Sequence, residues 1–124
     1  MADYYRKLTE ITEIPAPDAL IQGSYSSDVV ALGSPGDYKR GLLLMSGENG
    51  FVPATSTALA GADEVCICAE NISFTEGTAA SAAYFTGTFS PQSIILDWEQ
   101  EGDDHSELIE AIRPELRRRK IFMN

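Results

Sequence analysis

The chain of 124 residues has a single histidine, and residues 41–112 contain no lysine or arginine. Twelve acidic residues fall in that stretch, and the net charge of the chain is −10. Because proteins bind nucleic acid chiefly by neutralising phosphates with basic side chains, this long stretch is unsuited to that role. No G-x-S-x-G or phosphate-loop motif is present. We therefore expect neither a nucleic-acid-binding protein nor an enzyme.

Long apolar runs are also absent. No run approaches the roughly 18 residues that a membrane-spanning helix needs, and residues 1–7 lack the apolar stretch of a secretory signal. The sequence predicts a soluble protein that is made in the cytoplasm and has no membrane partner. The chain length fits one domain with one modest hydrophobic core.

Cysteine is scarce as well. Cys66 and Cys68 are two residues apart, so that on a strand they would point to the same face. A disulfide between them would close a ring too tight for ordinary geometry. Two thiols and one histidine also fall short of the four ligands of a structural zinc site. We interpret both cysteines as small core residues in a reducing compartment, and we expect no metal or other cofactor.

The first 96 residues divide into an arm and a β-rich body. Residues 1–27 form the expected arm, in which Pro15 and Pro17 break regular structure. The body contains short apolar segments separated by glycine, proline and asparagine, and the expected strands are 29–32, 41–45, 51–53, 64–69, 79–89 and 93–96. Since no long helix separates these segments, they predict a mostly β domain, either a small barrel or a sandwich.

The last part of the chain predicts an acidic loop at residues 97–104 and a short C-terminal helix at about 104–120. Asp104 and Glu107 have the spacing of a capping box. Four apolar residues then recur at helical spacing, namely Leu108, Ile109, Ile112 and Leu116. Pro114 predicts either a kink or the start of a second short turn. The β-rich domain with this helix would span residues 28–124.

The acidic loop is the one segment that invites a metal-binding interpretation. With Asp97 at position one of a calcium loop, Gly102 falls at position six, as an EF-hand requires. Position twelve, however, is Leu108 rather than glutamate. We therefore favour a solvated acidic loop, although calcium binding stays open.

Three other polar or aromatic features have ordinary structural interpretations. We expect His105 to be a solvated surface residue rather than a general base, and we expect Trp98 to pack at the core or its rim. Residues 117–120 carry four basic side chains. At the end of a helix these charges suit the helix dipole, and on so acidic a chain we prefer this interpretation to a nucleic-acid site.

Several short segments occur in a distinctive order, namely KRGLLL at 39–44, GFVP at 50–53, VCICAENI at 65–72 and KIF at 120–122. This order resembles the head decoration proteins of tailed bacteriophages, the family of the bacteriophage lambda head decoration protein. The resemblance covers roughly residues 28–123. Residues 1–27 and 100–104 do not match closely, and Cys66 and Cys68 replace the usual small or aliphatic residues without changing the apolar pattern.

The resemblance implies a decoration-protein fold that is mostly β with little helix. It also implies a structural virion protein, a homotrimer on the outer surface of the capsid that clamps the major capsid protein of the expanded shell. In that family the N-terminal arm orders against the shell. The apolar residues of the arm that would anchor it to the capsid are Tyr4, Tyr5, Leu8, Ile11 and Ile14.

Two hypotheses from other functional classes stay open. The first is a monomeric β-barrel module that binds a peptide or a small ligand. The second is a small hydrolase whose site is built from the acidic loop. The mass of the native particle would separate the first from a trimer, and calcium titration would test the second.

Overall fold

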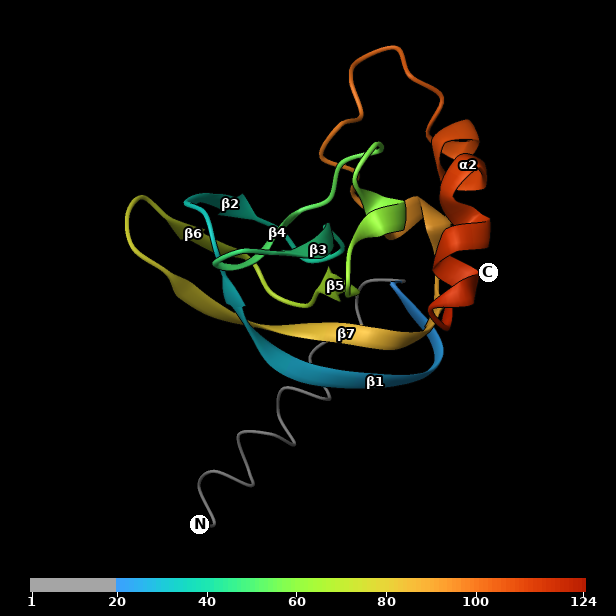
Figure 1. The fold of residues 1–124 in the computed structure, drawn as a ribbon. Helices are drawn as coiled ribbons and strands as arrows, with labels where there is room; N and C mark the ends of the chain where they lie inside the picture. Colours follow the sequence, from blue (N-terminus) through green and yellow to red (C-terminus); the bar gives the residue numbers. More distant parts are fainter. Residues whose placement is uncertain (1–19) are drawn as a thin grey trace.

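The computed structural model describes residues 20–124 (Figure 1). Its strands are β1 (Ile21–Leu32), β2 (Gly36–Tyr38), β3 (Leu43–Gly47), β4 (Gly50–Pro53), β5 (Val65–Cys68), β6 (Ile72–Phe74), β7 (Ala79–Phe89) and β8 (Ile121–Met123). Two 3₁₀ helices, η1 (Leu59–Gly61) and η2 (Pro91–Ser93), and the α-helix α2 (His105–Arg118) complete the described part. The predicted mostly β class with one C-terminal helix is confirmed.

Five strands pair in a closed ring. The order is β1-β4-β3-β5-β7, and an antiparallel pairing of β7 with β1 closes it. The β1–β4 contact is parallel and consists of the single pair Leu32 and Phe51. β8 adds to β7 in parallel, and β2 and β6 form a separate two-stranded sheet. In Figure 1 the long β1–β7 ribbon lies beneath the shorter strands, with β2 and β6 at one end and α2 at the other.

The strands β3 and β5 supply buried residues to two hydrophobic clusters, one on each face. Val65 and Ile67 belong to the cluster that includes the buried side of α2, whereas Cys66 and Cys68 belong to the cluster beneath β2 and β6. This alternation is the period-two pattern of a strand with both faces covered. Both cysteines are buried and free, which confirms their interpretation as core residues. Burial, assisted by the neighbouring Cys68 and Glu64, raises the pKa of the Cys66 thiol.

The helix begins where its sequence signals place it. Asp104 is the N-cap, and its Oδ1 accepts a hydrogen bond from the Ser106 backbone N–H at 3.0 Å. The predicted apolar stripe faces the core through three buried residues, Ile109, Ile112 and Leu116. Pro114 lies inside this one helix, so the helix does not end at the proline.

Two predicted boundaries differ from the structure. We expected an arm through residue 27, yet β1 begins at Ile21 and pairs with β7 as far as Leu32. Conversely, residues 93–96 do not form a strand. Ser93 is the last residue of η2, and the residues after it contribute one isolated bridge, between Ile95 and Leu42. In both places a partner distant in the sequence decides the backbone conformation. No helix within residues 20–124 is long and apolar enough to span a membrane.

Candidate interaction surface

The residues predicted to anchor the arm lie outside the described part of the chain. These residues are Tyr4, Tyr5, Leu8, Ile11 and Ile14. The description starts at Leu20, which is buried in the core at 1% exposure, directly before β1. The described part of the chain therefore starts directly before its longest strand, whose first seven residues belong to the predicted arm, and the surface along this strand is the place to look for a partner site.

One edge of β1 is open over most of its length. β7 pairs with β1 from Ile21 to Leu32 on one side. On the other side, β4 reaches only Leu32. Within residues 20–124, no strand pairs with this second edge between Gly23 and Val30. These eight residues span about 25 Å of backbone, and such an edge offers its N–H and C=O groups to another strand.

The pairing of β1 with β7 has register shifts between Ile21 and Tyr25 and between Ser26 and Ser27, and such irregularities partly protect an exposed strand, but other protective features are few. Native proteins guard long edges with lysine, proline or inward-pointing charges. Residues 21–32 contain neither lysine nor proline, and Asp28 is the one charged residue in β1. Val29 is 68% exposed and Tyr25 is 39% exposed. On a chain of net charge −10, this stretch with a single charged residue and exposed apolar side chains is distinctive.

The other side of β1 is held firmly by β7. The Ser26 and Thr86 hydroxyls are hydrogen-bonded at 2.6 Å, and the Tyr25 ring packs edge-on against Tyr84 with centroids 5.0 Å apart. Gly87 allows the close approach, because a Cβ there would lie 2.8 Å from the Ser24 carbonyl oxygen and its φ is +148°. The open edge is therefore presented on a fixed support.

A junction around Arg40 supports the same ribbon from inside the molecule. The Arg40 guanidinium donates to the Tyr84 hydroxyl at 2.7 Å and to the Ala69 carbonyl at 3.1 Å. The next residue, Gly41, has a φ of +100°, and a Cβ there would collide with the Ser93 carbonyl oxygen. The segment at residues 39–44 thus connects β2 and β3 while fixing β5, β7 and the end of η2.

His105 is not the solvated surface residue that we expected. Its Nδ1 lies 2.5 Å from Glu99 Oε1, and its Nε2 lies 2.7 Å from the Pro91 carbonyl oxygen. Both neighbours are acceptors, so the doubly protonated imidazolium satisfies both contacts at once. Partial burial alone would lower the pKa of His105, but the hydrogen bonds to Glu99 and Pro91 and the nearby Asp104 charge raise it. The imidazole therefore ties the start of α2 to the acidic loop and to η2.

The acidic loop uses some of its carboxylates to organise its own backbone. Asp103 Oδ2 accepts from the Gln100 N–H at 2.9 Å, and Asp104 caps α2. In the described part of the chain, no group of three or more histidine, cysteine or carboxylate side chains is placed to hold a metal ion. Trp98 is half-buried and packs against the core beside α2, as expected.

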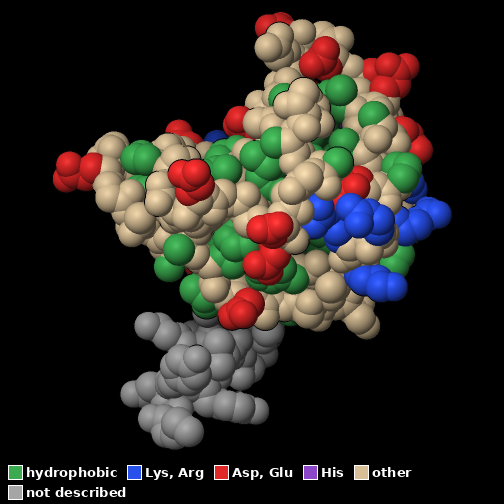
Figure 2. All heavy atoms as spheres, in the orientation of Figure 1, with side chains coloured by type: hydrophobic (Ala, Val, Ile, Leu, Met, Phe, Trp, Pro, Cys, Tyr) green, Lys and Arg blue, Asp and Glu red, His purple; other side chains and the backbone are tan. Residues whose placement is uncertain are grey.

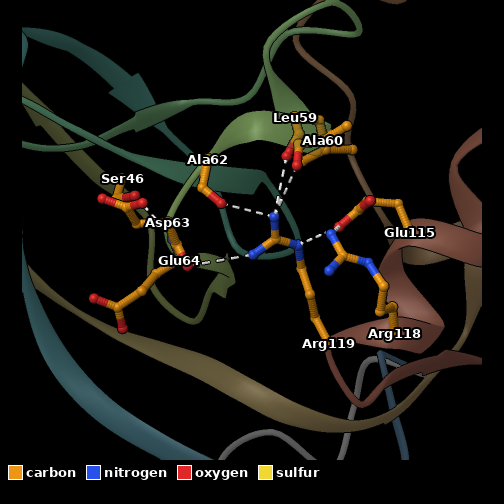
Figure 3. A network of polar contacts seen from close by, with 9 residues as sticks. All are labelled: Ser46, Leu59, Ala60, Ala62, Asp63, Glu64, Glu115, Arg118 and Arg119. Carbon is orange, nitrogen blue, oxygen red and sulfur yellow. Dashed lines mark hydrogen bonds and ion pairs between the residues drawn. The ribbon is translucent and has the colours of Figure 1, made fainter.

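The basic cluster at the end of α2 includes a buried clamp that sequence reasoning missed (Figure 3). Arg119 Nε donates to Glu115 Oε2 at 2.7 Å, and the Arg119 side chain is only 15% exposed. The guanidinium also donates to four backbone carbonyls of the loop before β5, those of Leu59, Ala60, Ala62 and Asp63. Partial burial would raise the pKa of Glu115, but its bonds with Arg118 and Arg119 lower it. Arg119 is therefore a structural residue rather than a binding residue.

Positive and negative side chains are distributed unevenly over the surface. Figure 2 shows lysine and arginine side chains gathered over the C-terminal half of α2, whereas aspartate and glutamate are spread over the rest of the visible face.

No protein-family model matches the chain, and no curated protein matches it significantly. The geometry of the described part thus provides an open strand edge and a charged helix end, which are features suited to binding another protein.

Proposed function

We propose that the chain is a structural virion protein that binds the outer surface of a phage capsid as a homotrimer and stabilises the expanded shell. The observation that carries this proposal is the open edge of β1, which has Asp28 as its one charged residue and whose first seven residues lie within the predicted arm. An extended segment of a partner can add to such an edge, with backbone hydrogen bonds giving affinity and alternate side chains giving register.

The segments that resemble the decoration proteins lie at structural junctions of this fold. Residues 39–44 lead from β2 into β3, and residues 50–53 are β4, which closes the ring against β1. Residues 65–72 form β5 and lead to Ile72, the first residue of β6. Ile72 pairs with Tyr38 of β2 in the two-stranded sheet. Residues 120–122 begin β8 beside β7. The order of these segments in the sequence, rather than their place in the fold, is what supports the proposal.

A trimer would suit a modest binding surface. Each copy offers one β1 edge and one arm, and three copies held together multiply weak contacts through effective concentration. The acidic body opposes contact with DNA, since like charges repel. The capsid partner would therefore meet the edge and the arm rather than the acidic loop.

Co-sedimentation with expanded, undecorated capsids tests the proposal. Deletion of residues 1–19, which spares the buried Leu20, should leave a folded trimer that no longer binds shells. Val29→Lys should weaken shell binding by at least about tenfold, because it places a charge beside the open edge. Ser56→Lys adds the same charge at an exposed loop position and should bind normally.

The native mass separates this proposal from the alternative classes. A particle of three 13.5 kDa chains that binds capsids agrees with the proposal. A stable monomer without affinity for capsids would contradict it and would favour the peptide- or ligand-binding module. Full capsid binding by both the truncated form and Val29→Lys would show that the arm and the edge are not the contact surface.

A further inference from the structure

The outermost stripe of α2 carries opposite charges at its two ends. Its members succeed each other at intervals of four, three and four residues, which places them on one face of a helix. All are exposed, and they are Glu107, Ala111, Pro114 and Arg118. The buried residues Ile109, Ile112 and Leu116 occupy the opposite face of α2. The stripe is therefore the part of the helix most accessible to another molecule.

The middle of this stripe is small and uncharged. Ala111 and Pro114 separate the two charged ends, and a surface hollow beside Pro114 is lined by Glu110, Arg113, Arg117 and Arg118. A proline inside a helix removes one backbone hydrogen bond, and the exposed Pro114 gains little packing within its own domain in return. The small side chain of Ala111 lets a second helix approach closely there.

We infer that this stripe is a contact surface for the same stripe of a second copy of the chain, packed antiparallel. A two-fold axis between Ala111 and Pro114 would set Ala111 of each helix opposite Pro114 of the other. The same rotation sets Glu107 of each copy opposite Arg118 of the other. The contact is thus isologous, with two identical ion pairs flanking a small centre.

Charge complementarity selects this occupant and this orientation. Glu107 has no ion pair among residues 20–124, and the Arg118 side chain is 65% exposed. Arg118 Nη2 bonds Glu115 at 2.6 Å, and the remaining guanidinium N–H groups can bind a second carboxylate. A parallel pairing would instead bring Glu107 against Glu107 and Arg118 against Arg118, which repel each other.

The contact is weak between free molecules and gains strength when copies are held side by side. Each exposed ion pair contributes little to the free energy of association. Such pairs hold two molecules together only when the effective concentration of the partner is raised. The two-fold contact does not depend on the proposed trimer, whose symmetry is three-fold. If trimers form, the contact joins neighbouring trimers.

Disulfide crosslinking of two single-cysteine variants tests the register. Glu107→Cys and Arg118→Cys are at exposed positions, and the native Cys66 and Cys68 are buried. A mixture of the two variants should crosslink at least about fivefold faster than either variant alone. Within one variant, the two cysteines across the axis would lie about 16 Å apart along the helices, beyond the reach of a disulfide. Equal rates in the mixture and in each variant alone would overturn the inference.

Charge reversal gives a second, independent test by sedimentation equilibrium at low salt. Arg118→Glu should weaken association between particles by at least about fivefold, and adding Glu107→Arg to it should restore association. Lys39→Glu makes the same change in net charge at an exposed site away from α2 and should have no effect. Loss of association in Lys39→Glu, or no rescue in the double variant, would contradict the inference. Capsid binding should persist in Arg118→Glu, so that failure here and failure of the proposed function can be told apart.

Discussion

The β1 edge and the C-terminal end of α2 are both exposed, yet they differ in how their polar groups are satisfied. Arg113, Arg118 and Arg119 already form ion pairs with carboxylates of the same helix. Along β1, the polar groups on the open edge belong to the backbone, and this edge has no strand partner from Gly23 to Val30 in the described part of the chain. The Val29 N–H is the exception, because it donates to Asp28 Oδ1 at 2.7 Å. A charged helix end tolerates water, whereas a long open strand edge favours another strand. The comparison indicates that β1 is the stronger candidate for a partner contact.

The largest expected effect separates the two faces of α2. Ile112→Asp should destabilise the fold by roughly 3–5 kcal/mol, because it buries an unpaired carboxylate in the core beside α2. The matched change Ala111→Asp, one residue away on the exposed stripe, should cost less than about 1 kcal/mol. Thermal and urea unfolding of both variants measure the difference. Equal melting temperatures would show that α2 does not pack as described.

The support of β1 can be tested at its closest approach to β7. Gly87→Ala should destabilise the fold by about 2 kcal/mol or more, because the added Cβ meets the Ser24 carbonyl oxygen and the Tyr25 Cβ and because the φ of Gly87 is positive. Gly61→Ala, with nothing within 4 Å of its added Cβ, is the control. Urea unfolding should distinguish them. A harmless Gly87→Ala would mean that the β1–β7 ribbon is looser than the structure shows.

The clamp at the end of α2 predicts an intermediate effect. Arg119→Met keeps the aliphatic part of the side chain but removes its hydrogen bonds to Glu115 and to the loop before β5, and it should cost about 1–3 kcal/mol. Arg117→Met, at an exposed position of the same cluster, should be nearly neutral. Hydrogen exchange of residues 59–63 should accelerate in the Arg119 variant alone. Unchanged exchange there would refute the clamp.

The smallest effect is a pH dependence at His105. Its pKa is raised in the folded state, so its stabilising contribution is complete below the unfolded pKa of about 6.5 and is lost as pH rises through the higher folded pKa. His105→Gln should flatten the fall in melting temperature over that range. Identical pH profiles for the two proteins would show that the contacts with Glu99 and Pro91 do not favour the imidazolium.

The sequence predicted elements whose signals are local and missed those set by distant partners. The helix was predictable from the Asp104 cap and its apolar spacing, and β5 and β7 from their apolar runs. The start of β1 was missed because its glycine and serine residues lack an apolar pattern, and β7 supplies the pairing. Ile94 and Ile95 favoured a strand, but Ile95 makes a single bridge.

The polar contacts of the site were less predictable than the fold. His105 meets a backbone carbonyl fourteen residues earlier, and Arg119 meets carbonyls almost sixty residues away. Contacts with backbone carbonyls of this kind cannot be predicted from the spacing of side chains along the sequence. The open edge of β1 was also hidden, because strand order depends on topology rather than on the composition of one segment.

The ring of strands is joined between β1 and β4 by one residue pair, Leu32 and Phe51. Nine pairs, in contrast, connect β1 to β7. Partial opening of the domain therefore starts at this seam, where few hydrogen bonds must break, and the β1–β7 ribbon remains assembled. Such an opening would expose only the edge of β4 that faces β1, since β4 stays paired with β3, and it would leave the β1–β7 ribbon in place as a template for refolding.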